Sequence, residues 1–186
     1  MLALGNPGAQ YQNTRHNVGF KVADRIAADA NKSFKKPVFK SYHLCTVESG
    51  KNRLYLLKPL TYVNKSGIAA RQALRAFGVG MSDMLVVCDN LDLNPGSCRI
   101  KRGGKDAGHN GLKSIIEFTG NANFLRLYIG IGHPGRQDGV VDWVLGEPDV
   151  GDSKMIEDSV GRASQAIEAL LTQDLEQVMN DLNRKR

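Results

Sequence analysis

The sequence is poor in cysteine and has no long apolar run. Its three cysteines, Cys45, Cys88 and Cys98, show no CxxC spacing and lie within apolar segments, so we expect reduced core residues rather than disulfides. No segment reaches the roughly 18 apolar residues that a membrane-spanning helix needs, and no secretory signal precedes Leu4. We therefore expect a cytoplasmic protein that has no membrane partner.

The histidines and the glycine-rich segment argue against two further kinds of site. The four histidines lack ligand spacings such as HxxxH, so we expect no metal ion and no cofactor. The segment GGKDAGHNG at residues 103–111 lacks the GxxxxGK[ST] pattern of a phosphate-binding loop, which argues against a nucleotide triphosphatase. Any chemistry must then come from ordinary polar side chains.

Two polar motifs near the N-terminus are candidates for such chemistry. The motif GNPG at residues 5–8 contains two glycines and a proline, which force a sharp turn and hold Asn6 on a defined loop. The motif TRHN follows at residues 14–17, where apolar residues at helical spacing predict that a helix begins. A histidine with a pKa near about 6.5 can accept a proton at neutral pH, so His16 is a candidate base. The alternative is a surface histidine that caps the helix.

Three later segments place polar side chains where strands end or helices begin. The segment KPLTYVNKSG at residues 58–67 puts Asn64 between a predicted strand at 54–57 and a predicted helix at 68–77. The apolar run 84–88 predicts a buried strand with Asp89 at its carboxyl end, and Asn110 lies where a helix opens after the glycine-rich segment. Ligands of open α/β sheets bind outside the carboxyl ends of the strands, so we expect one shared site. Its members would be Asn6, Asn64, Asp89 and Asn110.

The order of the predicted elements indicates an α/β fold. Strand-like runs at 44–47, 53–57, 84–88, 98–101 and 124–132 alternate with helical segments, which predicts a β-sheet flanked by α-helices. No linker, repeat or low-complexity block divides the chain, so we expect a single globular domain over residues 1–186. Apolar residues at helical spacing predict one long amphipathic helix over residues 155–182.

Positive charge is in excess and is clustered. The net charge is +6 and the pI is near 9.3. One cluster consists of Lys32, Lys35, Lys36 and Lys40, and a second of Arg99, Lys101, Arg102 and Lys105. A basic arc beside a polar pocket suits a polyanionic substrate such as a nucleic acid, although such a run is also typical of a solvated face.

Together these motifs resemble the bacterial peptidyl-tRNA hydrolases. The resemblance covers nearly the whole chain and includes GNPG, TRHN, the Asn64 turn, Asp89 with LDL at 91–93, GHNGLKSI at 108–115, IGIGHPG at 129–135 and VLG at 144–146. It implies a mixed twisted β-sheet flanked by α-helices in one globule, and we expect a monomer. It also implies hydrolysis of the ester that joins a peptide to tRNA in peptidyl-tRNA, which recycles tRNA released by ribosomes.

The resemblance also implies roles for particular residues. His16 is expected to be the general base on a water molecule, with Asp89 accepting a hydrogen bond from the other ring nitrogen and Asn6 orienting the carbonyl or the water. Substrate contacts are expected from Tyr11, Tyr62, Val63, Asn64, His109 and Asn110. Phosphate contacts to tRNA are expected from Arg99, Lys101 and Lys105.

The chain departs from the family pattern at several positions. Val63 stands where the family commonly has methionine, and Asn90 where an acidic residue commonly follows the aspartate. Tyr128 stands where a basic residue is common, which removes one expected phosphate contact. The family usually has a few more strand residues before GNPG, so we expect either a clipped first strand or a start codon that is assigned late.

Two other classes of protein would share some of these features. A non-catalytic RNA-binding protein, similar to plant organellar splicing factors, would be expected to carry a transit peptide and a hydrophobic partner-binding surface. An esterase for small molecules would not need the basic clusters. Release of peptide from a blocked aminoacyl-tRNA, compared with cleavage of a plain ester, would distinguish the three.

Overall fold

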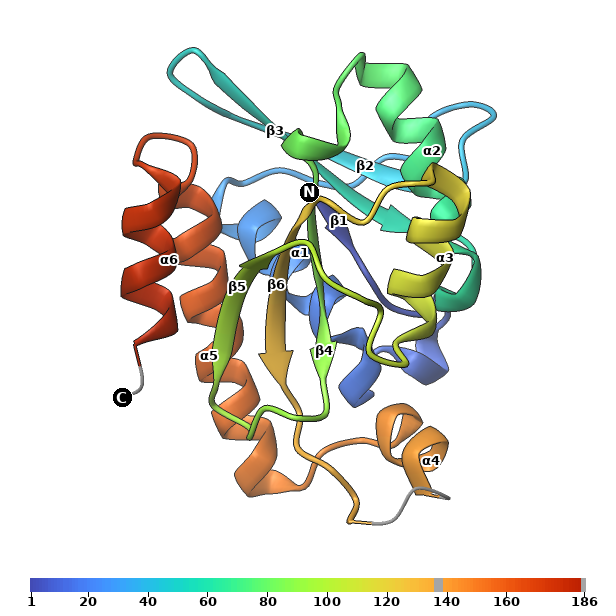
Figure 1. Ribbon diagram of the computed structural model, residues 1–186, viewed down its shortest axis with the longest axis vertical. Helices are drawn as coiled ribbons and strands as arrows, with labels where there is room; N and C mark the ends of the chain where they lie inside the picture. Colours follow the sequence, from blue (N-terminus) through green and yellow to red (C-terminus); the bar gives the residue numbers. More distant parts are fainter. Residues whose placement is uncertain (136–138, 185–186) are drawn as a thin grey trace.

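A six-stranded β-sheet forms the centre of the molecule (Figure 1), and the computed structural model describes residues 1–135 and 139–184. The order across the sheet is β2-β3-β1-β4-β6-β5. The four central strands are parallel to one another, and the edge strands β2 and β5 are antiparallel to their neighbours. The strands are β1 (Leu2–Ala3), β2 (Tyr42–Ser49), β3 (Asn52–Pro59), β4 (Leu85–Asn90), β5 (Cys98–Arg102) and β6 (Leu125–Gly130).

Helices cover both faces of this sheet. Helices α1, α5 and α6 pack on one face, while α2 and α3 pack on the other (Figure 1). The helices are α1 (Val18–Asp29), α2 (Ser66–Phe77), α3 (Asn110–Thr119), α4 (Val140–Leu145), α5 (Val150–Ala169) and α6 (Leu175–Asn183). Across residues 1–135 and 139–184, no helix has both the length and the apolarity to cross a membrane. The predicted class, a mixed α/β sheet flanked by helices, is confirmed.

Strand β4 shows why an unbroken apolar run predicted a central strand. Leu85 and Val87 point into the core under α1 and α5, whereas Val86 and Cys88 point into the core under α2 and α3. A strand that is buried on both faces needs apolar side chains at successive positions, rather than at alternate ones. All three cysteines are buried and free, as the sequence predicted.

Helix α1 lies unusually close to the central strands because of Gly19. A Cβ atom at this position would lie 2.5 Å from the carbonyl oxygen of Leu4 and 2.6 Å from that of Val87. Both are backbone atoms of the sheet, so no side chain could move aside to accommodate it. The close contact holds the segment before α1, which contains His16, against the carboxyl end of β4.

The prediction of one long C-terminal helix over 155–182 was wrong. The chain forms α5 and then turns into α6, whose N-terminus is capped by the Asp174 carboxylate accepting from the backbone N–H of Glu176. The turn lets Val178 and Leu182 join the same buried core as α5, and a straight helix would carry them away from the sheet. Helical spacing identified the apolar residues but not the turn between the two segments.

Candidate active site

His16 and Asp89 form a buried pair at the carboxyl edge of the sheet. His16 belongs to a short 3₁₀ helix, η2 (Arg15–Asn17), that precedes α1, and Asp89 lies near the end of β4. The Nδ1 atom of His16 is 2.7 Å from Oδ1 of Asp89. With the carboxylate ionised, Nδ1 carries the proton and donates a hydrogen bond to Asp89. The Nε2 atom of His16 is then left with a free lone pair, as a general base requires.

Burial and mutual attraction both act on the pKa values of this pair. Burial opposes ionisation of Asp89, but the electrostatic attraction and hydrogen bonds of His16 and His109 outweigh burial and lower the pKa of Asp89 well below its usual value. Burial also opposes protonation of His16, yet the attraction and hydrogen bond of Asp89 leave the pKa of His16 above its usual value. Asp89 is therefore the charged partner and His16 the group that takes up protons.

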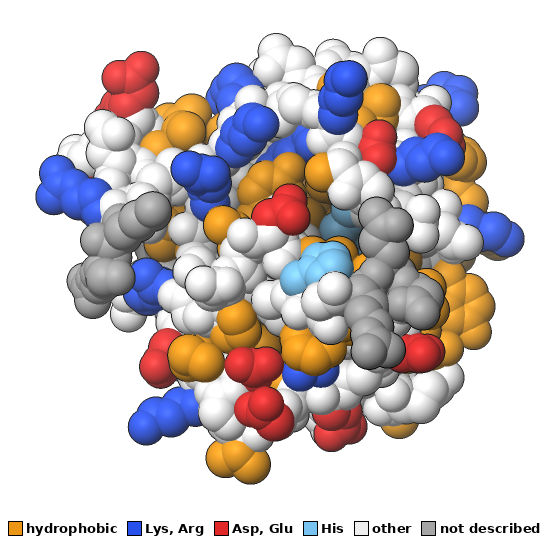
Figure 2. Space-filling view, turned by 60° about the horizontal axis from the view of Figure 1, so that its bottom comes forward, with side chains coloured by type: hydrophobic (Ala, Val, Ile, Leu, Met, Phe, Trp, Pro, Cys, Tyr) orange, Lys and Arg blue, Asp and Glu red, His pale blue; other side chains and the backbone are white. Residues whose placement is uncertain are grey.

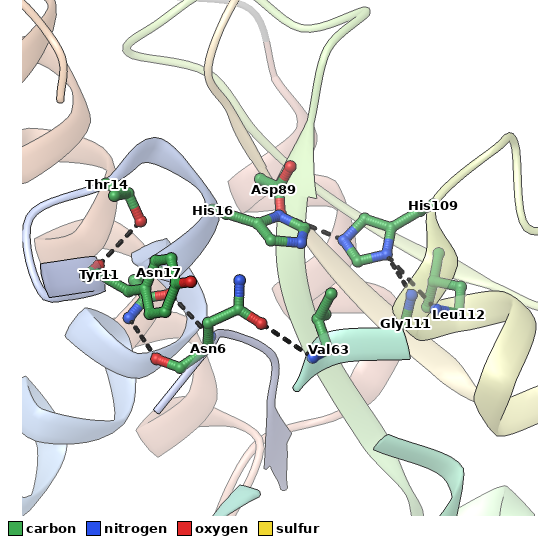
Figure 3. A network of polar contacts seen from close by, with 10 residues as sticks. All are labelled: Asn6, Tyr11, Thr14, His16, Asn17, Val63, Asp89, His109, Gly111 and Leu112. Carbon is green, nitrogen blue, oxygen red and sulfur yellow. Dashed lines mark hydrogen bonds and ion pairs between the residues drawn. The ribbon is translucent and has the colours of Figure 1, made fainter. Parts of the chain in front are cut away.

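A second histidine contacts the same carboxylate (Figure 3). The Nε2 atom of His109 is 3.1 Å from Oδ1 of Asp89, and its ring lies 5.2 Å from that of His16, centroid to centroid. Its Nδ1 atom accepts hydrogen bonds from the backbone N–H groups of Gly111 and Leu112, so His109 is the N-cap of α3. The glycine-rich segment thus brings this histidine to the strand end.

The amide side chain of Asn6 is held in one orientation. Its backbone N–H donates to Oδ1 of Asn17, and Nδ2 of Asn17 donates back to its carbonyl oxygen. Its own Oδ1 accepts from the backbone N–H of Val63 at 2.9 Å. Because the oxygen is occupied in this way, the amide nitrogen is the end that faces the space beside His16 in Figure 3. Asn6 therefore presents hydrogen-bond donors to the site.

The His16–Asp89 pair, called the dyad below, lines a pocket of about 440 Å³. His16, Asp89, His109, Asn110 and Tyr128 contribute to its walls, and α4 contributes an apolar wall through three valines, Val140, Val141 and Val144. Figure 2 shows histidine side chains in a hollow on one face, with Lys and Arg side chains gathered along one side of it. A neighbouring pocket of about 630 Å³ is lined by Asn6 and Asn17. The structure thus brings His16, Asp89, His109 and Asn110 together and places Asn6 beside them.

The remaining predicted substrate residues are arranged differently. Tyr11 and Tyr62 pack edge to face with ring centroids 6.2 Å apart, and Tyr62 is 55% exposed. Val63 is buried, and its side chain would contact a Cβ atom added at Gly111. Asn64 is exposed and lines neither of the two pockets. Of the four polar residues expected in one site, Asp89 and Asn110 share the pocket of the His16–Asp89 pair, and Asn6 lines the neighbouring pocket.

Strand β5 carries two of the predicted phosphate-binding residues. Arg99 and Lys101 are exposed and alternate with the buried Cys98 and Ile100, so both lie on the same face of the strand. Arg99 lies opposite Tyr128 in the register, and Tyr128 reaches the pocket of the dyad. Lys105 is exposed on the glycine-rich segment that follows. These cations therefore lie beside the pocket rather than inside it.

Arg126 has a structural role that the sequence analysis missed. Its side chain is fully buried, and its guanidinium donates to the carbonyl oxygens of Gly104, Lys105 and Ala122. The guanidinium also lies 4.6 Å from the centre of the Phe124 ring. Arg126 thereby ties the glycine-rich segment to β6.

Arg15 and Asn17, which flank His16, also have roles that the sequence analysis missed. The Arg15 guanidinium stacks 3.8 Å from the centre of the Trp143 ring in α4 and donates to the backbone oxygen of Glu147. Asn17 holds Asn6, as described above. Their position within the TRHN motif was the available signal, but a motif does not reveal which residue each side chain contacts.

The departures at positions 90 and 128 are also explained by local contacts. The Oδ1 atom of Asn90 accepts from the backbone N–H of Asp92, so this side chain stabilises the turn that follows β4. The Tyr128 hydroxyl accepts from the Arg126 guanidinium at 3.4 Å. Neither residue replaces the charge that the family commonly carries at its position.

The residues around Asp89 also include a possible metal-ligand set. His16, Asp89 and His109 have ligand atoms within 4.8 Å of one another. The same ring nitrogens, however, donate hydrogen bonds to Asp89, and the other nitrogen of His109 caps α3. A metal ion would have to displace these bonds, so the donor set suits proton transfer better than metal binding.

Comparisons with known proteins give a consistent result. The sequence model of the family described as peptidyl-tRNA hydrolase matches residues 1–186. The peptidyl-tRNA hydrolase of Bacillus subtilis is 41% identical over 185 residues, which cover 100% of this chain and 98% of that protein. That of Francisella tularensis is 38% identical over 100% of this chain and 97% of its own. The crystal structure of peptidyl-tRNA hydrolase from Acinetobacter baumannii superposes with a TM-score of 0.94 at 32% identity, covering 100% of this chain and 94% of that one.

Proposed function

Since the chain belongs to the peptidyl-tRNA hydrolase family, we propose that its His16–Asp89 pair is the catalytic centre for the hydrolysis of peptidyl-tRNA. The enzyme hydrolyses the ester bond between the peptide and tRNA, which releases both. The observation that carries the proposal is the buried 2.7 Å contact from Nδ1 of His16 to Asp89, because it leaves Nε2 free to act as a base.

The reaction then needs one water molecule and one base. Nε2 of His16 takes a proton from the water as its oxygen attacks the ester carbonyl carbon, and the Asp89 carboxylate stabilises the resulting imidazolium. When the tetrahedral intermediate collapses, the bond from the carbonyl carbon to the ribose oxygen breaks. The imidazolium returns its proton to that oxygen, so the products are a free peptide carboxyl group and a tRNA hydroxyl group. His16 ends the cycle as it began.

Asn6 would stabilise the developing oxyanion. Its oxygen is held by the backbone N–H of Val63, so its amide nitrogen remains available to donate toward the reacting carbonyl. A donor whose orientation is set before the reaction does not have to reorganise in the transition state. Asn6 is therefore the third member of the catalytic group.

The other side chains would hold the two parts of the substrate. Asn110 lines the pocket at the first turn of α3 and can bond a peptide amide or the acceptor end of the tRNA. Tyr11 and Tyr62 form an aromatic pair beside the Asn6 loop. Val63 would contribute apolar packing, and Asn64 would contact the substrate from its exposed position beside Val63.

Arg99, Lys101 and Lys105 would bind tRNA phosphates. All three are exposed cations next to the pocket, where they can hold the polyanion while its acylated end reaches His16. Tyr128 occupies the space between this basic face and the dyad, so one further phosphate contact of the family is replaced by an aromatic ring.

The chain would act alone and without a cofactor. We expect residues 1–186 to function as a single domain, as a cytoplasmic monomer, without a bound metal ion. The support for the last point is that three of the four ring nitrogens of His16 and His109 are already used, as hydrogen-bond donors to Asp89 or as the cap of α3, which leaves only Nε2 of His16.

Replacement of His16 tests the proposed mechanism. We expect His16→Ala to lower turnover of N-acyl-aminoacyl-tRNA by at least about 100-fold with little change in tRNA affinity, as for a residue that transfers a proton. Single-turnover rates and tRNA binding, measured on the same preparation, separate the two effects. Near-normal turnover in this variant would contradict the mechanism.

A further inference from the structure

His109 is held by the protein at both of its ring nitrogens. Its Nδ1 lies 3.1 Å from the backbone nitrogen of Gly111 and 3.4 Å from that of Leu112. A backbone N–H can only donate, so Nδ1 must be the acceptor and can carry no proton. The single ring proton is therefore on Nε2, which donates a hydrogen bond to Oδ1 of Asp89 at 3.1 Å. The N-terminus of α3 thus sets the tautomer of this histidine.

One carboxylate oxygen consequently accepts from two imidazole rings. Oδ1 of Asp89 is 2.7 Å from His16 and 3.1 Å from His109, and the contacts among the three side chains are buried or half-buried. The rings lie close together and are tilted by 36° to each other (Figure 3). The negative charge of Asp89, which stabilises a proton on His16, is therefore shared with a second donor, His109. The only acceptor atom of His109, Nδ1, is already occupied by the backbone of α3.

We propose that His109 is a positioning residue, which acts through Asp89 and limits how strongly His16 holds its proton. This inference rests on the proposed role of His16 as the base. A carboxylate bonded by His16 alone would bind the imidazolium more tightly and would return the proton to the leaving group less readily. The second donor also keeps the carboxylate aimed at His16. In this role His109 acts on the reaction through Asp89, which differs from the substrate contact that the family resemblance implies for it.

Other ionisable groups face the same pocket but are not bonded to either ring. They are Asp92 after β4, Asp106 before α3, Tyr128 on β6 and His133 after β6. Within the described part of the chain, Asp89 is the carboxylate that bonds His16 and His109. The Asp106 carboxylate accepts from the backbone N–H of Gly108, which lies in the same loop.

Two substitutions of His109 separate its two contacts. His109→Asn keeps a side-chain acceptor of the kind favoured at a helix N-cap, but its side chain is too short to reach Asp89. His109→Gln places an amide nitrogen where Nε2 was and removes the Nδ1 cap. We expect the His109→Asn variant to keep its thermal stability and to show an acid limb of the kcat/KM pH profile that is higher by about 0.5 to 1 pH unit. We expect the His109→Gln variant to keep the acid limb in place and to have a Tm lower by about 2 to 4 °C.

Each outcome decides between the proposal and its alternatives. An unchanged acid limb in His109→Asn would assign His109 to helix capping alone, and a higher KM without a pH shift would assign it to substrate binding. Nitrogen NMR of the histidine rings gives a second readout, in which His109 should show a protonated Nε2 and an unprotonated Nδ1. The opposite tautomer would overturn the inference. An active His16→Ala would instead contradict the proposed function.

Discussion

His16 and Asp89 are joined by one buried hydrogen bond of 2.7 Å, although 73 positions separate them in the chain. The imidazole belongs to the short helix η2, which precedes α1, and the carboxylate belongs to β4, in the middle of the sheet. Because Gly19 lets α1 lie directly on β1 and β4, the two groups meet without a long side chain to bridge the distance.

Replacing the carboxylate with an amide should impair catalysis less than removing the imidazole. Asp89→Asn keeps the shape of the contact and loses the charge that stabilises the imidazolium, so we expect turnover to fall by about tenfold or more. The loss should remain smaller than that in His16→Ala. Single-turnover rates of the two variants make the comparison. A silent Asp89→Asn substitution would point to Asp92, which lines the same pocket, as the partner of His16.

The rate should depend on pH through His16. Burial lowers the pKa of His16, but Asp89 raises it more, so the pKa of His16 lies above its usual value. A general base acts when unprotonated, so kcat/KM should fall as the pH is lowered through a midpoint above about 6.5. In Asp89→Asn the attraction is lost while the burial remains, and the midpoint should move down. A midpoint that stays in place in this variant would show that Asp89 does not control His16.

Asn6 offers a test of the oxyanion donor. Asn6→Asp keeps an acceptor for the backbone N–H of Val63 but replaces the donor with a negative charge, so we expect turnover to fall by about 100-fold or more. Asn13→Asp is the matched control, since it adds the same charge seven residues further along the chain at an exposed position. Equal rates for the two variants would remove Asn6 from the catalytic group.

The basic residues beside the pocket should control binding rather than chemistry. Changing Arg99, Lys101 and Lys105 together to Gln should weaken tRNA binding, and the slope of log K against log salt should flatten by about 0.9 for each lost phosphate contact. Cleavage of a minimal ester substrate should continue. Affinity measured over a series of salt concentrations gives the slope.

A matched triple variant controls for loss of charge. Lys51, Arg53 and Lys154 are exposed; the first two belong to the β2–β3 hairpin and the third to α5. Changing them to Gln removes the same charge and should leave the local contacts near the dyad unaltered. If the salt slope flattens equally in both triple variants, then Arg99, Lys101 and Lys105 belong to an ordinary solvated face.

Arg126 should be required for stability rather than for tRNA binding. Arg126→Met removes the donors to the carbonyl oxygens of Gly104, Lys105 and Ala122, so we expect the free energy of unfolding to fall by about 2 to 4 kcal/mol. Arg99→Met, at an exposed position on the neighbouring strand, should change it by less than about 0.5 kcal/mol. Denaturant unfolding of both variants provides the comparison, and equal stabilities would contradict the assigned role.

Much of the site followed from the order of residues along the chain. An apolar run that ends in Asp89 predicts a buried strand with a carboxylate at its end, and the carboxyl ends of parallel strands share one edge of a sheet. The turn at Asn6 and the helix start at His16 follow from glycine, proline and helical spacing in the same way. These signals are local, so the sequence by itself determined the α/β class and which residues to expect at the candidate site.

The tertiary structure alone decided how those residues are used. Helical spacing could not predict the turn between α5 and α6, because the turn depends on the core that Val178 and Leu182 join. The tautomer of His109 depends on the backbone of α3 at one nitrogen and on a carboxylate 20 positions away at the other. In the sequence Arg126 looks like any other cation. In the structure its buried guanidinium donates hydrogen bonds to three carbonyl oxygens. Such roles are set by contacts between distant segments, which no local pattern encodes.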